Sequence, residues 1–107
     1  MDASIKILEG VLAESKEYYL DIKNKIEAKL AGLPKGSIKH RKISGRSYYY
    51  LQERAGQKVV HKYLGASRPD VLVKQLEERK ALKAELKKVD EALRMLKRAE
   101  GRKKQHG

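Results

Sequence analysis

The chain has 107 residues and a mass of 12.2 kDa, the size of a single domain spanning residues 1–107. It carries 26 Lys and Arg against 14 Asp and Glu, a formal net charge of +12, and it has no Cys. These figures exclude a disulfide or thiolate–metal scaffold and a large α/β enzyme core. No stretch approaches the roughly 20 apolar residues of a membrane span, and residues 1–10 lack the apolar centre of a secretory signal, so we expect a cytoplasmic protein without a membrane partner.

The positive charge is concentrated in the middle of the chain. Residues 1–31 have a net charge of −1, residues 32–68 of +8, and residues 69–107 of +5. Because a strong basic excess favours anionic partners, the central residues are the first place to look for a binding surface.

The first 31 residues are predicted to form a helix. Apolar residues alternate at spacings of three and four, the pattern of an amphipathic helix that can enter a coiled coil. They are Ile5, Leu8, Leu12, Tyr19, Ile22 and Ile26, with Ser15 in the one vacant place. Gly32 and Pro34 end the pattern, since Gly accepts the left-handed position after a last turn and Pro cannot continue a helix.

The period then changes to two. Residues 38–43, 47–54 and 58–64 are rich in Tyr, Val and Ile, and they are separated by Ser44-Gly45 and Ala55-Gly56. Pairs of this kind form two-residue hairpin loops. Residues 37–64 are therefore predicted to form a three-stranded antiparallel β-meander.

A second long helix is predicted over residues 67–101. Ser67 is a plausible N-cap, and Pro69 suits the first turn because its missing N–H costs nothing there. The apolar pattern returns at Leu82, Leu86, Val89, Leu93 and Leu96. Residues 102–107 are expected to be a basic, disordered tail. The fold class is α+β: two long helices, as a coiled-coil-like hairpin or a dimer core, flank the inserted sheet.

Two-residue loops fix which residues pair and so which side chains share a face. The loop at Ser44-Gly45 pairs Lys39 with Tyr50 and Ile38 with Leu51. The loop at Ala55-Gly56 pairs Arg54 with Gln57, Leu51 with Val60, Tyr50 with His61 and Tyr48 with Tyr63. A three-residue loop at either turn would exchange the faces of one strand.

This register predicts two unlike faces. One is apolar, with the row Ile38, Leu51 and Val60, and is expected to pack against the helices. The other is basic and aromatic; it carries Lys39, Arg41, Arg46, Arg54 and His61 interleaved with Tyr48, Tyr50 and Tyr63. Lys and Arg neutralise phosphates, Arg also contacts guanine edges, and Tyr stacks on unpaired bases or donates to phosphate. The alternative is that the Tyr residues are cross-strand pairs that stabilise a small sheet and the cations are simply solvated.

The helices are predicted to pack through their apolar seams, within one chain or between two. Each has a second apolar stripe beside the seam. These stripes are Ile7, Val11 and Leu20 in the first helix, and Val73 and Leu76 in the second. A four-helix homodimer would use both stripes, and we expect this arrangement.

Catalytic and metal-binding patterns are missing from the sequence. His40 and His61 fall on opposite faces of the predicted sheet and His106 lies in the tail, so no metal site is expected. No nucleophile, base and orienting group can be assembled at any defensible spacing. We expect no enzyme activity and no cofactor.

The central segment contains four distinctive motifs in a fixed order: Leu33-Pro34-Lys35-Gly36-Ser37-Ile38, Gly45-Arg46-Ser47-Tyr48-Tyr49-Tyr50-Leu51, Gly56-Gln57-Lys58-Val59 and Lys62-Tyr63-Leu64-Gly65. In these motifs it resembles a family of short bacterial and archaeal proteins known only as a domain of unknown function. This segment is also similar to the amino-terminal sheet module of some insertion-sequence transposases and to the arm-binding module of tyrosine recombinases, whose sheet lies in the DNA major groove. The latter resemblance implies DNA contacts for Arg41, Arg46, Tyr50, Lys58 and Lys62. The catalytic domains of both enzyme groups have no counterpart here, so neither activity is implied.

The sequence therefore predicts a non-catalytic nucleic-acid-binding protein that uses the basic, Tyr-rich face of its sheet, with DNA favoured over RNA. The competing hypothesis is a protein-interaction or scaffold module that acts through its coiled-coil helices and has no nucleic-acid role.

Overall fold

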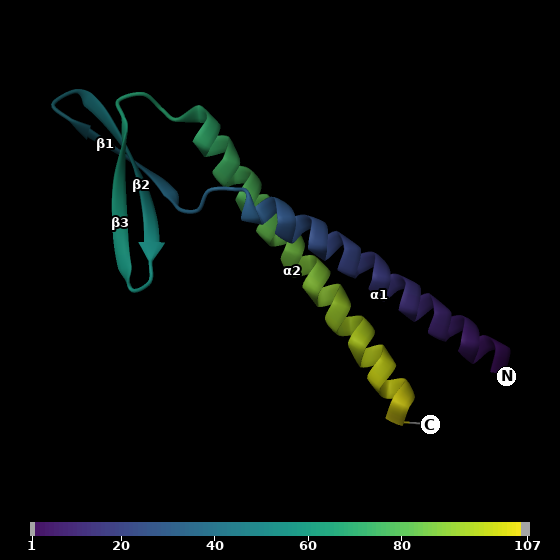
Figure 1. Cartoon of the computed structure of the whole chain (residues 1–107). Coiled ribbons are helices and arrows are strands. Elements are labelled where there is room, and N and C mark those ends of the chain that lie inside the picture. Colours follow the sequence, from purple (N-terminus) through teal and green to yellow (C-terminus); the bar gives the residue numbers. More distant parts are fainter. Residues whose placement is uncertain (1, 106–107) are drawn as a thin grey trace. The chain divides into compact units, whose positions relative to one another are not determined.

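A computed structural model describes the backbone of residues 2–105 and the side chains of residues 5–101. The elements follow one another as α1 (Asp2–Ala31), β1 (Ser37–Ile43), β2 (Arg46–Ala55), β3 (Lys58–Gly65) and α2 (Asp70–Gln105) (Figure 1). Two helices flanking a three-stranded antiparallel sheet of order β1-β2-β3 confirm the predicted α+β fold class.

The chain divides into two compact units. Residues 32–81 form the sheet unit, which contains the three strands and the first turns of α2. The helical unit contains α1 and the remainder of α2 from Leu82 onwards. The long helix α2 thus belongs to both units.

Both ends of α2 differ from the prediction. The helix begins at Asp70 rather than at residue 67, and the carbonyl of Pro69 accepts the first helical hydrogen bond from the N–H of Val73 at 2.9 Å. Since a proline disfavours the helical conformation in the residue before it, the helix starts only after Pro69. At the other end α2 continues through Gln105 instead of ending at residue 101. The residues expected to form a tail include Arg, Lys and Gln, which have high helix propensity. His106 lies outside the described residues.

The first hairpin has the predicted register. Ile43 pairs with Arg46, Lys39 with Tyr50 and Ile38 with Leu51. Ser44 has a φ of 51° and Gly45 a φ of 78°, and positive φ at both loop positions is the pattern of a type I′ turn.

The second hairpin corrects the predicted register by two residues. Its loop is Gly56-Gln57 rather than Ala55-Gly56, so that Ala55 pairs with Lys58. The observed pairs are Arg54 with Val59, Glu53 with Val60, Gln52 with His61, Leu51 with Lys62 and Tyr50 with Tyr63. The predicted pairs Arg54–Gln57, Leu51–Val60, Tyr50–His61 and Tyr48–Tyr63 are therefore wrong. The register shifts once more between Tyr49 and Tyr50, beyond which Tyr49 pairs with Gly65.

Turn chemistry explains this difference. Gly56 has a φ of 65°, and the only described non-glycine residue with positive φ is Ser44. Positive φ at the first loop position alone, with Gly there, is the pattern of a type II′ turn. A type I′ turn at Ala55-Gly56 would instead force Ala55 into the left-handed region, at a cost of about 1–2 kcal/mol.

The core of the sheet unit is small. Leu51 is buried at 8% exposure and Ile38 is half-buried, as the predicted apolar face requires. Val60 is 48% exposed and does not complete the predicted row, because its partner across the sheet is Glu53. Among the apolar residues of the first turns of α2 in this unit, Leu72, Val73 and Leu76 are half-buried, whereas Val71 is 73% exposed.

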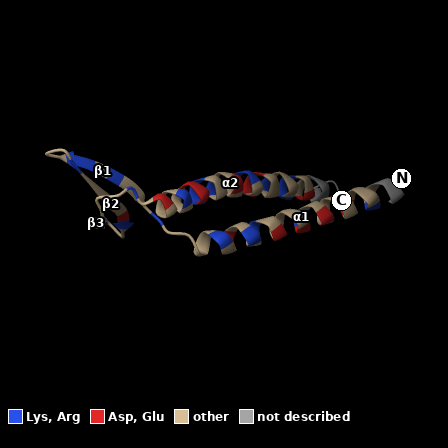
Figure 2. Cartoon of the chain, turned by 90° about the horizontal axis from the view of Figure 1, so that it is seen from above, with Lys and Arg blue, Asp and Glu red and all other residues tan. Residues whose placement is uncertain are grey.

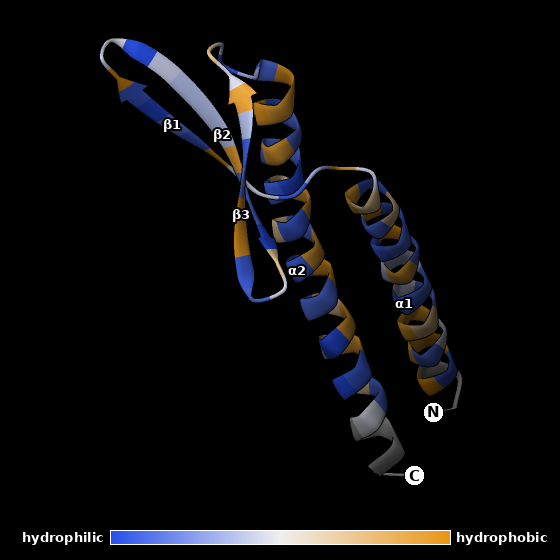
Figure 3. Cartoon of the chain, turned by 60° about the vertical axis from the view of Figure 1, so that its left-hand side comes forward, coloured by the Kyte–Doolittle hydropathy of each residue, from blue (hydrophilic) through white to orange (hydrophobic). Residues whose placement is uncertain are grey.

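The helical unit brings α1 and α2 together in antiparallel directions. Ile26 and Val89, one from each predicted seam, are the buried hydrophobic residues described in this unit. Lys23 donates a 2.8 Å hydrogen bond to Asp90, and Lys16 lies 3.9 Å from Glu100. Because lower numbers in α1 face higher numbers in α2, the antiparallel pairing occurs within one chain, as one of the two sequence alternatives proposed. The alternation of apolar and polar residues along α1 is visible in Figure 3.

Candidate functional site

One face of the sheet gathers eight of the ten predicted site residues. Side chains alternate between the two faces of a sheet, so the pairs Lys39–Tyr50, Arg41–Tyr48 and Tyr50–Tyr63 assign these residues to a common face. We call it the tyrosine face; it comprises Lys39, Arg41, Arg46, Tyr48, Tyr50, Arg54, His61 and Tyr63. Although the second register differs from the prediction by two residues, an even shift leaves every side chain on its predicted face.

The centre of the tyrosine face is hollowed. Lys39 and Arg41 from β1, Tyr50 from β2 and His61 from β3 line a depression of about 200 Å³. All three strands therefore contribute to one site. Lys39, Arg41 and His61 are exposed and Tyr50 is half-buried, so the hollow is lined by two cationic side chains, an imidazole and an aromatic ring.

Three tyrosine rings form a continuous cluster across β2 and β3. The Tyr63 ring centroid lies 5.5 Å from that of Tyr50 and 6.2 Å from that of Tyr48, with the rings tilted by 55° and 45°. These tilted arrangements lie between parallel stacking and edge-to-face contact, and they do not cover the ring faces completely. Tyr63 is 54% exposed. The guanidinium carbon of Arg41 lies 5.9 Å from the centroid of the Tyr50 ring, within the range of a cation–π contact.

The remaining cations of the tyrosine face lie toward its ends. Arg46 is the first residue of β2, directly after the first turn, and Arg54 is next to the last residue of the same strand. Both are exposed. Lys and Arg residues are especially dense along β1, which is largely blue in Figure 2. The arrangement can therefore neutralise several phosphates along a strand and present aromatic rings between them.

The two remaining predicted residues, Lys58 and Lys62, lie on the opposite face of the sheet. Lys62 pairs with Leu51, and Lys58 pairs with Ala55, both of which alternate away from Tyr50. The resemblance to the recombinase module predicted them, and the structure does not bring them together with the tyrosine face.

The opposite face also carries a pair that the sequence analysis does not single out. The rings of His40 and Tyr49 stack with centroids 4.5 Å apart and an interplanar angle of 5°. The Nε2 atom of His40 lies 3.0 Å from the hydroxyl oxygen of Ser47, within hydrogen-bond distance. The register of the first hairpin, which the sequence predicts correctly, already places His40 opposite Tyr49. The pair could therefore have been found from the sequence.

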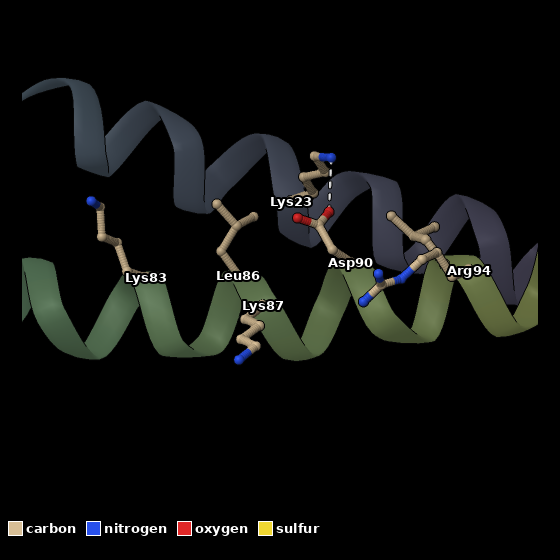
Figure 4. Close-up of a pocket in the computed structure, with 7 residues that line it drawn as sticks. Lys23, Lys83, Leu86, Lys87, Asp90 and Arg94 are labelled. Atoms are coloured by element: carbon tan, nitrogen blue, oxygen red, sulfur yellow. Dashed lines mark hydrogen bonds and ion pairs between the residues drawn. The ribbon is translucent and has the colours of Figure 1, made fainter.

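The helical unit contains an open groove with mixed charge. Its lining includes Lys23 from α1 and Lys83, Leu86, Asp90 and Arg94 from α2. Figure 4 shows Leu86 and Asp90 directed toward α1. The hydrogen bond that Lys23 donates to Asp90, followed by the attraction of that carboxylate, raises the pKa of Lys23 above its usual value of 10.5. This groove is the contact between α1 and α2, and the acidic residue in its lining, Asp90, is paired with Lys23.

Other kinds of site find no support in the described residues. Among residues 2–105, no three His, Asp or Glu side chains come together as a metal site would require. None of the described helices combines the length and apolar character that crossing a membrane demands.

The fold and site thus define a small α+β protein in which two long helices precede and follow, along the chain, a sheet with one basic, aromatic face. Comparison with known proteins places residues 16–74 within the family described as a domain of unknown function, DUF6788. The match covers more than half of the chain, and the protein belongs to this family. No curated protein matches the chain, and neither does any solved structure.

Proposed function

We propose that this protein binds nucleic acid, DNA in preference to RNA, through its tyrosine face, and that it does so without catalysis. The observation that carries the proposal is the hollow in which Lys39, Arg41 and His61 surround the ring of Tyr50. Cations from separate strands are held on one side of a sheet, close to the half-buried rings of Tyr48 and Tyr50 and the exposed ring of Tyr63. The sequence resemblance of this segment to the arm-binding module of tyrosine recombinases, whose sheet lies in the DNA major groove, is the argument for DNA.

Electrostatics favour a polyanion over a single acidic ligand. The net charge of +8 over residues 32–68 includes only one acidic residue, Glu53, and Glu53 alternates to the face opposite Tyr50. The tyrosine face therefore presents Lys39, Arg41, Arg46 and Arg54 with no carboxylate among its described side chains. Such a surface gains affinity chiefly by releasing counterions from a phosphate backbone.

The corresponding prediction concerns a variant with both Arg41→Ala and Arg46→Ala. We expect weaker binding to a duplex oligonucleotide and a plot of log affinity against log salt that is flatter by about two units, because two phosphate contacts are lost. Fluorescence anisotropy over a salt series measures both quantities.

A matched control is available on the same sheet. Lys58→Ala with Lys62→Ala removes the same charge from the opposite face, and we expect a change in slope well below that of the arginine pair. Equal losses from both pairs would show that net charge, rather than the tyrosine face, determines binding. Binding that survives both pairs but disappears when residues 102–107 are removed would assign it to the C-terminal residues and overturn the proposal.

We further propose that the protein is a homodimer through the amino-terminal half of α1. The seam that buries Ile26 in the contact with α2 continues along α1 to Leu8 and Ile5, where the residues are 54% and 48% exposed. Ile7 and Val11 beside it are 67% and 52% exposed. An apolar stripe that continues an existing helix contact is best covered by the same stripe of a second copy, in the two-fold arrangement typical of homodimers.

Sedimentation equilibrium tests the dimer. We expect a dimer at tens of micromolar, and a monomer when Leu8→Glu and Val11→Glu place charges in the stripe. Ala13→Glu with Ala28→Glu, at exposed positions on the opposite side of α1, is the matched control and should remain dimeric. A monomeric wild-type protein at this concentration would contradict the proposal. If the wild-type protein were monomeric, bound no nucleic acid and captured another protein, the scaffold hypothesis would replace both the nucleic-acid proposal and the dimer proposal.

A further inference from the structure

We propose, resting on the proposed function, that the tyrosine face binds an unpaired nucleotide of a single-stranded segment in preference to a duplex. The base stacks on the exposed ring of Tyr63, beside the hollow, and the adjoining phosphate enters the hollow against Lys39 and Arg41. The duplex is then the weaker ligand, bound by charge alone.

The geometry of the three tyrosine rings leaves Tyr63 the most accessible of them. Arg41 lies over the ring of Tyr50, and Tyr50 is half-buried, so that one face of this ring is already in contact with a cation. Tyr63 touches Tyr50 and Tyr48 at tilted angles and is 54% exposed. The cluster therefore holds Tyr63 in place from two sides and leaves surface of its ring free, as a stacking platform requires.

The chemistry of tyrosine is the second step. In a duplex the faces of the bases are covered by their neighbours and only the base edges are offered in the grooves. Those edges are read best by the paired donors and acceptors of Arg, Asn and Gln, whereas a tyrosine ring offers one hydroxyl. An unpaired base exposes its face, and aromatic stacking on it is tolerant of base identity. Three tyrosines at the centre of the face, with arginines toward the ends of β2, match an unpaired strand better than a groove.

The size of the hollow is the third step. At about 200 Å³ it is smaller than the roughly 300–1,000 Å³ of pockets that enclose whole small molecules. It can accept a part of one nucleotide, and it would not retain a free nucleotide by enclosure. The ligand is therefore a nucleotide within a strand, with the neighbouring phosphates held by Arg46 and Arg54 further along the face.

The test compares Tyr63→Leu with Tyr63→Phe in the full chain. The probes are a 12-nucleotide DNA strand with a central 2-aminopurine, its duplex with the complement, and the matching RNA strand. We expect wild type to quench 2-aminopurine in the single strand. Tyr63→Leu should lose that quenching and bind the strand about tenfold more weakly, while its affinity for the duplex stays within twofold; Tyr63→Phe should retain both properties. Tyr18→Leu, at an exposed tyrosine of α1, is the matched control, and circular dichroism verifies that each variant is folded.

Each outcome separates the inference from the proposed function. Equal affinity for strand and duplex, unchanged by Tyr63→Leu, would show that the cluster only stabilises the sheet; the inference would fail and DNA binding would stand. No binding to any probe would overturn both. Tighter binding of the RNA strand, with the same dependence on the Tyr63 ring, would support the inference and overturn the preference for DNA.

Discussion

Replacing Leu51 with Ala is expected to lower the free energy of unfolding of the sheet unit by about 2–4 kcal/mol. Leu51 is 8% exposed, and it is the one residue of this unit among the buried hydrophobic side chains of the described residues. A small unit buries little apolar surface, so that the loss of its most buried side chain removes a large share of its stability. Denaturant unfolding followed by circular dichroism measures the change, and affinity for nucleic acid should fall with the folded fraction.

Val60→Ala is the matched control for this prediction. The sequence pairs Val60 with Leu51 in one apolar row, whereas the structure pairs it with Glu53 and leaves it 48% exposed. Its truncation should therefore cost less than about 0.5 kcal/mol. A loss as large as that of Leu51→Ala would mean that the two side chains pack together and that the second hairpin has the register expected from the sequence.

The tyrosine face could be predicted from the sequence because side chains alternate between the two faces of a strand. A register error of an even number of residues therefore leaves each side chain on its predicted face. Changing the second register by two residues replaces His61 with Tyr63 opposite Tyr50, but both odd-numbered residues stay on the same face. The face of Lys39 and Arg41 is determined by the first hairpin, independently of the second. The register of this hairpin is predicted correctly from its Ser44-Gly45 turn. Two separate turns thus lead to the same set of eight residues.

The pairing itself could not be predicted from the motif because Gly56 can serve two turn types. In Ala55-Gly56 it is the second residue of a type I′ loop, and in Gly56-Gln57 the first residue of a type II′ loop. Only the backbone cost of positive φ at Ala55 decides between them. The contacts of the tyrosine cluster beside the hollow depend on this decision, since it brings Tyr63 next to Tyr50 and places Lys62 beside Leu51 on the other face.

The second large effect is expected at the entry to the sheet, where Gly36→Ala should lower the free energy of unfolding by about 3 kcal/mol. Gly36 has a φ of 115°, a conformation that L-residues with a side chain rarely adopt. A Cβ atom there would lie 2.6 Å from the carbonyl oxygen of Gln52 and 2.9 Å from Leu51 Cδ1. Because the nearest atom belongs to the backbone of β2, the strand or the entering segment has to move. Thermal and denaturant unfolding measure the loss.

Gly56→Ala separates the two causes of this effect. Gly56 also has a positive φ, 65°, but an added Cβ would have no neighbour within 4 Å. Replacing Gly56 should lower the free energy of unfolding by only about 1–2 kcal/mol, which is what a positive φ costs a residue with a side chain. The difference between the two variants then measures the close approach of Gly36 to β2. Equal losses would mean that the segment before β1 moves away from β2 at no cost. A larger loss at Gly36 would show that this segment is held against Leu51, beneath the strand that carries Tyr48 and Tyr50, and that the position of the tyrosine face depends on a residue that takes no part in it.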